Sequence, residues 1–183
     1  MKLNIRFSGA GGQGVILASV LLAKAYGLDE GYNISQTQSY GPEARGGACK
    51  AEVVISDENI DYMKVDDADV FIAFNQAGYN KYCDRLSKDA RVLINSTLVE
   101  TDDPKHYRIP ATDIAEEMGK PFVINMIMLG ALTKMLPKVH YPSVETEIEE
   151  NWSASIASAN LEAYKKGYQY MEKELEAKTA EDA

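Results

Sequence analysis

Short apolar runs alternate along this chain with stretches of helical periodicity. Runs that are apolar throughout, or that alternate polar and apolar residues, are typical of strands, whereas apolar residues that recur every three or four positions predict helices. We expect strands at residues 2–8, 33–37, 48–56, 69–74, 91–95 and 106–109. We expect helices at residues 13–26, 76–86, 112–118, 122–136, 143–150 and 155–176, the third with Thr112 as its N-cap.

This order of elements predicts the fold class. Strands that alternate with helices are typical of an α/β sandwich with a largely parallel sheet. We therefore expect a single-domain, three-layer α/β sandwich with a Rossmann-like β-loop-α unit at its start. The domain would span residues 1–176, and residues 177–183 would form a frayed C-terminal tail. With 183 residues, 45% of them hydrophobic, the chain is long enough to bury one sizeable core.

Charge and hydropathy narrow the classes of partner. The formal net charge is −9, and nucleic-acid binders usually present a basic face to neutralise phosphates, so we expect no nucleic acid. The longest apolar stretch, residues 122–136, is shorter than the roughly 20 residues that span a bilayer. Since the chain also shows no leader-like segment, we expect a cytoplasmic protein without a membrane anchor.

The residues that most often bind metals are sparse. Cys49 and Cys83 are the two cysteines, too few for an iron–sulfur cluster, which usually takes four, and they form no zinc pattern. His106 and His140 have no paired acid nearby in sequence, so we expect surface or capping roles. The acidic run at 57–69 lacks the spacing of a calcium loop and is typical of a solvated face. We expect no metal site.

A glycine loop follows the first predicted strand. Gly9, Gly11 and Gly14 match the pattern G-x-G-x-x-G between a strand and a helix, where backbone N–H groups can approach an anion. An NAD or FAD site would need an acid at the end of the next strand, and Gln36 and Gln38 stand there instead. Three interpretations stay open at this point: a dinucleotide site, a structural tight turn, or close approach to another phosphate or to a partner backbone.

A second loop, "QTQSYGPEARGG" at residues 36–47, is more specific. Small neighbours leave the guanidinium of Arg45 free to bind a carboxylate or phosphate, and Glu43 could orient it. Tyr40 begins a bend. If the first two strands are neighbours, this loop lies beside the glycine loop at the carboxyl edge, where open α/β sheets bind ligands. The alternative is an internal Arg–Glu clamp that holds a surface loop.

Together the two loops resemble those of the gamma subunits of 2-oxoacid:ferredoxin oxidoreductases. That family has G-x-G-G-Q-G, then S-Y-G-P-E-x-R-G-G, then a strand that ends in Ser-Asp. This sequence supplies Gly9, Gly11, Gly12, Gln13 and Gly14, then Ser39 through Gly47, then Ser56-Asp57. The resemblance spans about residues 2–175 and is strongest to the 2-oxoglutarate branch, with the pyruvate, branched-chain and indolepyruvate branches left open.

The resemblance implies a subunit of an enzyme. The whole enzyme decarboxylates a 2-oxo acid on thiamine diphosphate, passes electrons through 4Fe–4S clusters to ferredoxin, and transfers the acyl group to coenzyme A. Thiamine diphosphate, Mg²⁺ and the clusters would belong to alpha, beta and delta partner subunits. Coenzyme A is a co-substrate, this chain would hold no cofactor tightly, and the isolated chain would be inactive.

The resemblance also assigns candidate site residues. It implies that both loops face the coenzyme A and cofactor side of the active site and the subunit interface, with no catalytic residue assigned. The cofactor-binding set is Gly9, Gly11, Gly12, Gln13, Gly14, Tyr40, Glu43, Arg45, Gly46 and Gly47. Weaker candidates follow two buried strands: Asn75 and Gln76, and Asn95 to Thr97. Two alternatives are a free-standing dinucleotide-binding module and a purely architectural scaffold subunit.

Overall fold

The computed structural model describes residues 1–41 and 47–183, which form one mixed β-sheet covered by helices. The strands are β1 (Lys2–Ala10), β2 (Asn33–Tyr40), β3 (Ala48–Ser56), β4 (Ala68–Ala73), β5 (Leu86–Asn95) and β6 (Tyr107–Ile109). Their order in the sheet is β2-β3-β1-β4-β5-β6. β3 runs antiparallel to β1 and β2, and the other neighbours are parallel. The predicted α/β class with a largely parallel sheet is confirmed.

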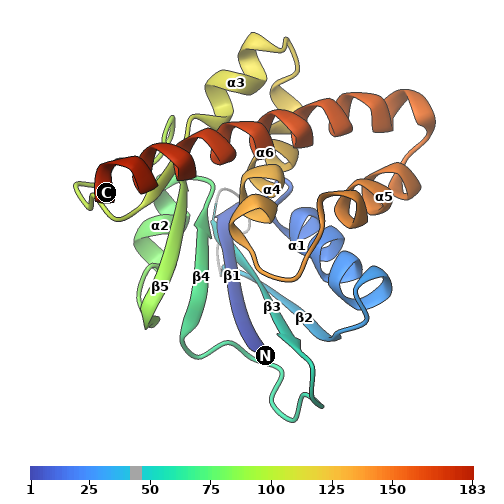
Figure 1. The fold of residues 1–183 in the computed structure, drawn as a ribbon, viewed down its shortest axis with the longest axis vertical. Helices are drawn as coiled ribbons and strands as arrows, with labels where there is room; N and C mark the ends of the chain where they lie inside the picture. Colours follow the sequence, from blue (N-terminus) through green and yellow to red (C-terminus); the bar gives the residue numbers. More distant parts are fainter. Residues whose placement is uncertain (42–46) are drawn as a thin grey trace.

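Helices cover both faces of this sheet (Figure 1). They are α1 (Val15–Lys24), α2 (Gln76–Tyr82), α3 (Ala111–Glu117), α4 (Ile124–Met135), α5 (Tyr141–Asn151) and α6 (Ala154–Asp182). A π-helical turn, η1 (Ala25–Asp29), extends α1, and a 3₁₀ turn, η2 (Pro121–Val123), precedes α4. α1, α4 and α6 pack over one face and α2 over the other, which gives the three predicted layers.

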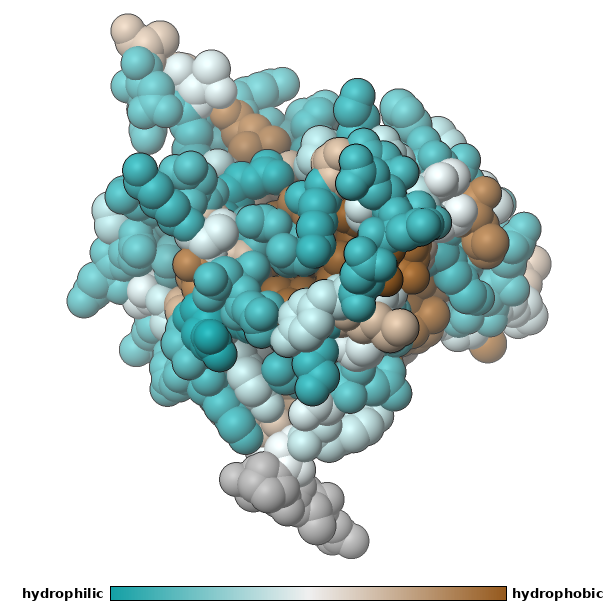
Figure 2. All heavy atoms as spheres, turned by 90° about the horizontal axis from the view of Figure 1, so that it is seen from below, coloured by the Kyte–Doolittle hydropathy of each residue, from teal (hydrophilic) through white to brown (hydrophobic). Residues whose placement is uncertain are grey.

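The core follows from the alternation of side chains along the strands. Val70 and Ile72 of β4 face the large cluster under α1 and α4, whereas Phe71 and Ala73 face the smaller cluster under α2. A strand covered on both faces must be apolar throughout, which explains the continuous run of apolar residues in β4. Viewed from the edge where β1 begins, the surface is mostly hydrophilic, and hydrophobic side chains show in its central hollows and at a few places on its periphery (Figure 2).

α4 is the apolar stretch noted in the sequence, and it lies inside the molecule. Its crossing with α6 is very close, because a Cβ atom on Gly130 would lie 2.0 Å from the carbonyl oxygen of Tyr164. A Cβ on Gly167 would likewise lie 1.9 Å from the carbonyl oxygen of Ile127. Among the described residues, no helix has the length and apolar character needed to cross a bilayer.

Several predicted boundaries are wrong. The helix expected at 76–86 ends at Tyr82, and the chain turns through Arg85, whose φ is 55°, before β5 begins at Leu86. The final helix does not stop near Glu176 but continues to Asp182. The first boundary was wrong because the first half of β5 is mostly polar and does not have the pattern of a buried strand. The second was wrong because the end of α6 carries no helix-stop signal.

The N-cap predicted for α3 is also wrong. Pro110 occupies that position and Thr112 lies within the first turn. The Thr112 hydroxyl accepts a hydrogen bond from the Asn95 amide at 2.9 Å, and the Asn95 Oδ1 lies 3.3 Å from the Thr112 N–H. A side chain from β5 therefore takes over the capping role, and sequence spacing alone cannot reveal that partner.

The first two strands are not neighbours, contrary to the condition placed on the second loop. β2 and β3 form an antiparallel pair, and β3 rather than β2 lies against β1. β2 is therefore the outermost strand. It still runs in the same direction as β1, since two antiparallel steps separate the two strands, so both end at the same edge of the sheet.

Candidate functional site: a glycine rim at the carboxyl edge

The glycine loop is a tight turn between β1 and α1. The Gln13 N–H donates to the Ala10 carbonyl at 3.2 Å, and Gly12 has a φ of +86°, which favours glycine. The Gln13 side chain closes the turn a second time, because its Oε1 accepts from the Ala10 N–H at 2.7 Å. The amide oxygen of Gln13, proposed from the resemblance as a binding residue, is thus used to hold the loop itself.

Gly9 and Gly14 are required by packing within this chain. A Cβ on Gly9 would lie 2.7 Å from the Val15 Cγ2. Gly14 is the N-cap of α1, with a φ of 75°, and a Cβ there would lie 2.3 Å from the Asn125 Nδ2. These two glycines let α1 and α4 approach β1 closely, so the structural-turn interpretation accounts for them.

Gly11 is different. It is exposed, a Cβ on it would meet nothing within 4 Å, and its φ is not positive. Neither packing nor backbone conformation within the described chain requires a glycine there. The start of α1 beside it carries no acidic residue in its first turn and no side-chain cap, so the first N–H groups of the helix can bind an outside acceptor.

Both ends of the second loop lie beside the glycine loop. Ala10, the last residue of β1, pairs with Ala48 at the start of β3, and Tyr40 pairs with Cys49. The Gly41 N–H donates to the Ala48 carbonyl at 3.1 Å. The loop that joins β2 to β3 is therefore anchored at the edge that carries Gly11, and we call this edge, residues 9–14 with 40, 41 and 47, the glycine rim.

The residues of the second loop are placed only in part. Tyr40 is 66% exposed and Gly47 is half-buried, so both lie at the rim as expected. Glu43, Arg45 and Gly46 lie outside the described residues. Their roles, and the choice between an anion site and an internal clamp, stay predictions.

The side chains of the weaker candidates at this edge form hydrogen bonds with backbone groups of this chain. Asn75 is the N-cap of α2, and its Oδ1 accepts from the Gly78 N–H at 2.8 Å. The Gln76 Oε1 accepts from the Glu100 N–H at 2.7 Å. Asn95 is fully buried, and besides binding α3 it donates to the Phe74 carbonyl at 3.1 Å. These amides fasten the elements that form the edge.

One residue that the sequence analysis did not select lies against the rim. Asn125, in the first turn of α4, is 7% exposed, and its Nδ2 lies 3.4 Å from the Gly14 carbonyl oxygen. The available signal for Asn125 was that it is the one polar side chain in the first eight residues of α4.

His106 is not the surface residue that was expected. It is 7% exposed, its Nε2 lies 2.9 Å from the Tyr79 hydroxyl, and its Nδ1 lies 3.7 Å from a carboxylate oxygen of Asp103. Burial lowers the pKa of this imidazole, with Asp103 partly opposing the shift. The acid lies three residues upstream and was overlooked, and Tyr79 comes from a different element.

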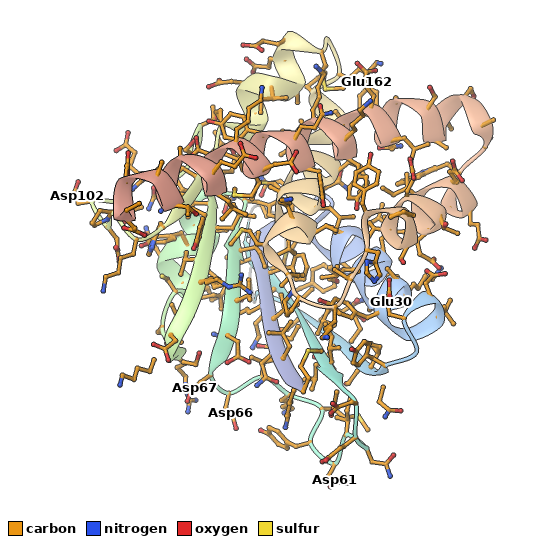
Figure 3. The ribbon with its side chains drawn as sticks, in the orientation of Figure 1. Glu30, Asp61, Asp66, Asp67, Asp102 and Glu162 are labelled. Atoms are coloured by element: carbon orange, nitrogen blue, oxygen red, sulfur yellow. The ribbon has the colours of Figure 1, made fainter. Side chains whose placement is uncertain are left out.

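The acidic run at 57–69 lies far from the rim. Asp61, Asp66 and Asp67 are found near the edge where β1 begins (Figure 3). Asp57 pairs with the amino terminus, and Asp66 accepts from the Tyr62 hydroxyl at 3.2 Å. The carboxylates of residues 57–67 are exposed to solvent, as predicted, whereas Asp69 is half-buried and accepts from the Asn4 N–H at 2.8 Å.

Fold and rim together define an α/β protein with a Rossmann-like β-loop-α unit whose glycine loop opens at the carboxyl edge of a mostly parallel sheet. The chain belongs to the pyruvate ferredoxin/flavodoxin oxidoreductase family, whose model matches residues 4–170. The family resemblance drawn from the two loops is confirmed.

Individual relatives cover nearly the whole chain. It is 46% identical to the 2-oxoglutarate synthase subunit KorC of Methanocaldococcus jannaschii over 92% of this chain and 94% of that protein. It resembles the crystal structure of a keto/oxoacid ferredoxin oxidoreductase gamma subunit from Geobacter sulfurreducens, with a TM-score of 0.82 and 34% identity over 92% of this chain and 95% of that one.

A third relative shares the fold. It is the 2-oxoglutarate:ferredoxin oxidoreductase of Magnetococcus marinus, whose structure holds 2-oxoglutarate, coenzyme A and succinyl-CoA. The match has a TM-score of 0.83 and 24% identity, and it covers 93% of this chain but 31% of that longer one. In that protein the fold seen here is one part of a larger polypeptide.

Proposed function

We propose that this chain is the gamma subunit of a 2-oxoglutarate:ferredoxin oxidoreductase. The observation that carries the proposal is the 46% identity to a 2-oxoglutarate synthase subunit over 92% of this chain and 94% of the relative. The whole enzyme would convert 2-oxoglutarate and coenzyme A to succinyl-CoA and carbon dioxide, with electrons passed to ferredoxin. This chain would act inside that complex.

The redox and thiamine cofactors would be held by partner alpha, beta and delta subunits. The residues present here do not fit those groups. Cys49 lies on β3 and Cys83 follows α2, and the described residues contain no group of three or more His, Cys, Asp or Glu side chains that could hold a metal ion. Mg²⁺ and the 4Fe–4S clusters therefore do not fit the described residues, and we propose that the rest of the complex holds them together with thiamine diphosphate.

The glycine rim would face coenzyme A or a partner backbone. Gly11 supports this role, because nothing in the described chain explains a glycine there. The uncapped N–H groups of α1 suit an anionic acceptor, and coenzyme A carries phosphates. Arg45 would be the chief anion ligand, Glu43 and Tyr40 would position it, and Gly46 and Gly47 would keep its approach open.

Substitution of Arg45 tests this role in the assembled complex. We expect Arg45→Ala to raise KM for coenzyme A by about 10- to 150-fold and to leave KM for 2-oxoglutarate unchanged, since one charge-assisted hydrogen bond contributes about 1.5–3 kcal/mol. Lys88→Ala, an exposed position near the start of β5, is the control and should change neither constant.

Two outcomes of that experiment separate the alternatives. If Arg45→Ala leaves both coenzyme A kinetics and subunit assembly unchanged, the role of this loop is wrong. If it weakens assembly but leaves the kinetics of the intact complex unchanged, the chain is an architectural subunit, and the contact with coenzyme A is excluded.

A free-standing dinucleotide-binding module is disfavoured by the position of β2. In such a module the second strand lies beside the first and ends in an acid that binds the ribose. Here β3 separates β1 from β2, and the Gln36 amide donates to the Ser19 hydroxyl on α1 at 3.1 Å. That side chain is used to fasten α1 to the sheet.

A further inference from the structure

The outer edge of the sheet at β2 is unpaired. β2 bonds only to β3, and every second residue of an outermost strand directs its N–H and C=O away from the sheet. Within residues 1–41 and 47–183, no other backbone group bonds to this edge. The result is a row of free donors and acceptors along Asn33–Tyr40.

Edges of this kind are usually protected, and in β2 a nearby loop is held only against the first half of the strand, where the Asn33 and Ser35 side chains donate to the Glu58 and Met63 carbonyls at 3.0 and 3.4 Å. Its eight residues, NISQTQSY, include no charged side chain and no proline, either of which would discourage pairing with another strand. The opposite edge is different. β6 is three residues long, and its Arg108 side chain donates to the carbonyls of Thr101 and Asp103, so a loop is held against it.

A hollow lies beside the free edge. It has a volume of about 350 Å³ and is lined by Thr37, Gln38 and Ser39 of β2, Lys50 and Glu52 of β3, and Lys64. When an extended peptide adds to a sheet edge, main-chain hydrogen bonds supply affinity and a side-chain pocket next to the edge supplies specificity. β2 has both features over residues 37–39.

The hollow carries an excess of positive charge. The buried Glu52 carboxylate is already bound by the Arg6 guanidinium at 3.1 Å and by the Lys50 ammonium at 3.0 Å, and it accepts from the Val65 N–H at 3.4 Å. Lys64 is exposed and has no ion-pair partner among the described residues. Two cations therefore meet one carboxylate, and Lys64 adds a third positive charge to the lining, in a chain whose net charge is −9.

Negative charge gathers at the other end of the strand. Asn33 donates to the Glu58 carbonyl at 3.0 Å, so the acidic run at 57–69 lies beside the start of β2. An acidic side chain on an incoming segment would be repelled there and attracted beside Thr37–Ser39. The charge pattern thus defines where on the segment the acid must lie.

We propose that β2 is completed in the assembly by an extended segment of another polypeptide, which pairs with residues 33–40 as an added strand and places an Asp or Glu side chain beside Lys64 and Lys50. This inference rests on the proposed function for the existence of a partner subunit. It does not depend on any contact between the glycine rim and coenzyme A.

Amide hydrogen exchange of the whole complex tests the pairing. In the isolated chain the outward amides of residues 33–40 should exchange rapidly, and in the complex their exchange should slow by at least about tenfold, because hydrogen-bonded amides exchange only on opening. Unchanged exchange of these amides in an assembled complex would overturn the proposal. Concentration-dependent protection in the isolated chain would mean that a second copy covers β2, and this would overturn it too.

Charge reversal tests the acidic partner. We expect Lys64→Glu to weaken binding to the partner subunits about tenfold and to speed exchange of the β2 amides, whereas Lys88→Glu should change binding by less than about twofold. Equal effects of the two variants would contradict the acidic side chain. A complex that protects β2 but does not use 2-oxoglutarate would instead contradict the proposed function.

Discussion

At the scale of single residues, the glycines of one motif have separate causes. Gly9 and Gly14 are required because a Cβ atom would collide with Val15 or Asn125. Gly12 is required by its positive φ. Gly11 meets neither requirement, so the reason for a glycine there must lie outside the described chain. The glycines of this one sequence motif therefore have different roles: Gly9, Gly12 and Gly14 are needed for the fold, and Gly11 lies on an open surface.

Alanine substitutions should separate these causes. We expect Gly14→Ala to lower the free energy of unfolding of the isolated chain by about 3 kcal/mol, since it combines a strained φ with a steric clash. Gly12→Ala should cost about 1 kcal/mol, and Gly11→Ala should change stability by less than about 0.5 kcal/mol. Urea unfolding of the three variants measures these changes in the free energy of unfolding.

The effect of Gly11→Ala should be visible in the assembled complex. Gly11→Ala should weaken either binding to the partner subunits or saturation by coenzyme A, because the added methyl group occupies space open to an approaching group. A Gly11→Ala complex with wild-type assembly and kinetics would show that this position has no outside contact.

His106 is the residue whose environment should be visible in the pH dependence of stability. Burial lowers its pKa in the folded state, so the unfolded chain binds the proton more readily. The free energy of unfolding should therefore fall as pH drops through about 6.5, the usual value for histidine, toward the lower folded pKa. His106→Gln should make stability less dependent on pH between about 5 and 7, as measured by urea unfolding. An unchanged slope would contradict a buried neutral imidazole.

At the scale of elements, the crossing of α4 and α6 holds the helical layer together. Gly130 and Gly167 face the opposite helix backbone, and neither position has room for a methyl group. Lys134 of α4 and Glu172 of α6 add a partly exposed ion pair across this crossing, and Lys120, just before η2, pairs with Glu162 of α6. Such pairs contribute little in water, so we attribute the stability of this contact mainly to close packing.

Gly167→Ala tests the importance of this crossing. The added Cβ would lie 1.9 Å from the Ile127 carbonyl oxygen, so the helices must separate, and we expect a loss of about 3 kcal/mol in the free energy of unfolding. Gln169→Ala, an exposed position on the same helix, should change it by less than about 0.5 kcal/mol. Urea or thermal unfolding measures both, and equal effects would show that the helices can move apart freely.

At the scale of the whole molecule, the topology separates two surfaces. The glycine rim lies where β1 and β2 end, and the acidic run at 57–69 lies where β1 begins (Figure 3). The insertion of β3 between β1 and β2 keeps the two loops at one edge but moves β2 to the outside. The position of β3 therefore both preserves the glycine rim and leaves the outer edge of β2 free. For this reason we assign the rim and the β2 edge to contacts in an assembly.

The amino-acid sequence by itself determined the class of fold, the six strands and the candidate loops. Period-two and period-3.6 patterns are local, so burial of one face or two can be read from neighbouring residues. The motif around Ser39–Gly47 likewise identified the family, which the match to residues 4–170 confirms. These features depend on residue types at fixed short spacings.

Only the tertiary structure decided which residues meet across the fold. The contacts of Asn125 with Gly14, Tyr79 with His106, and Arg6 with Glu52 join residues far apart in sequence. The place of β3 in the sheet has the same origin, because strand order depends on how whole elements pack rather than on any local pattern. Contacts of this kind leave no periodic signal, so they had to be seen in three dimensions.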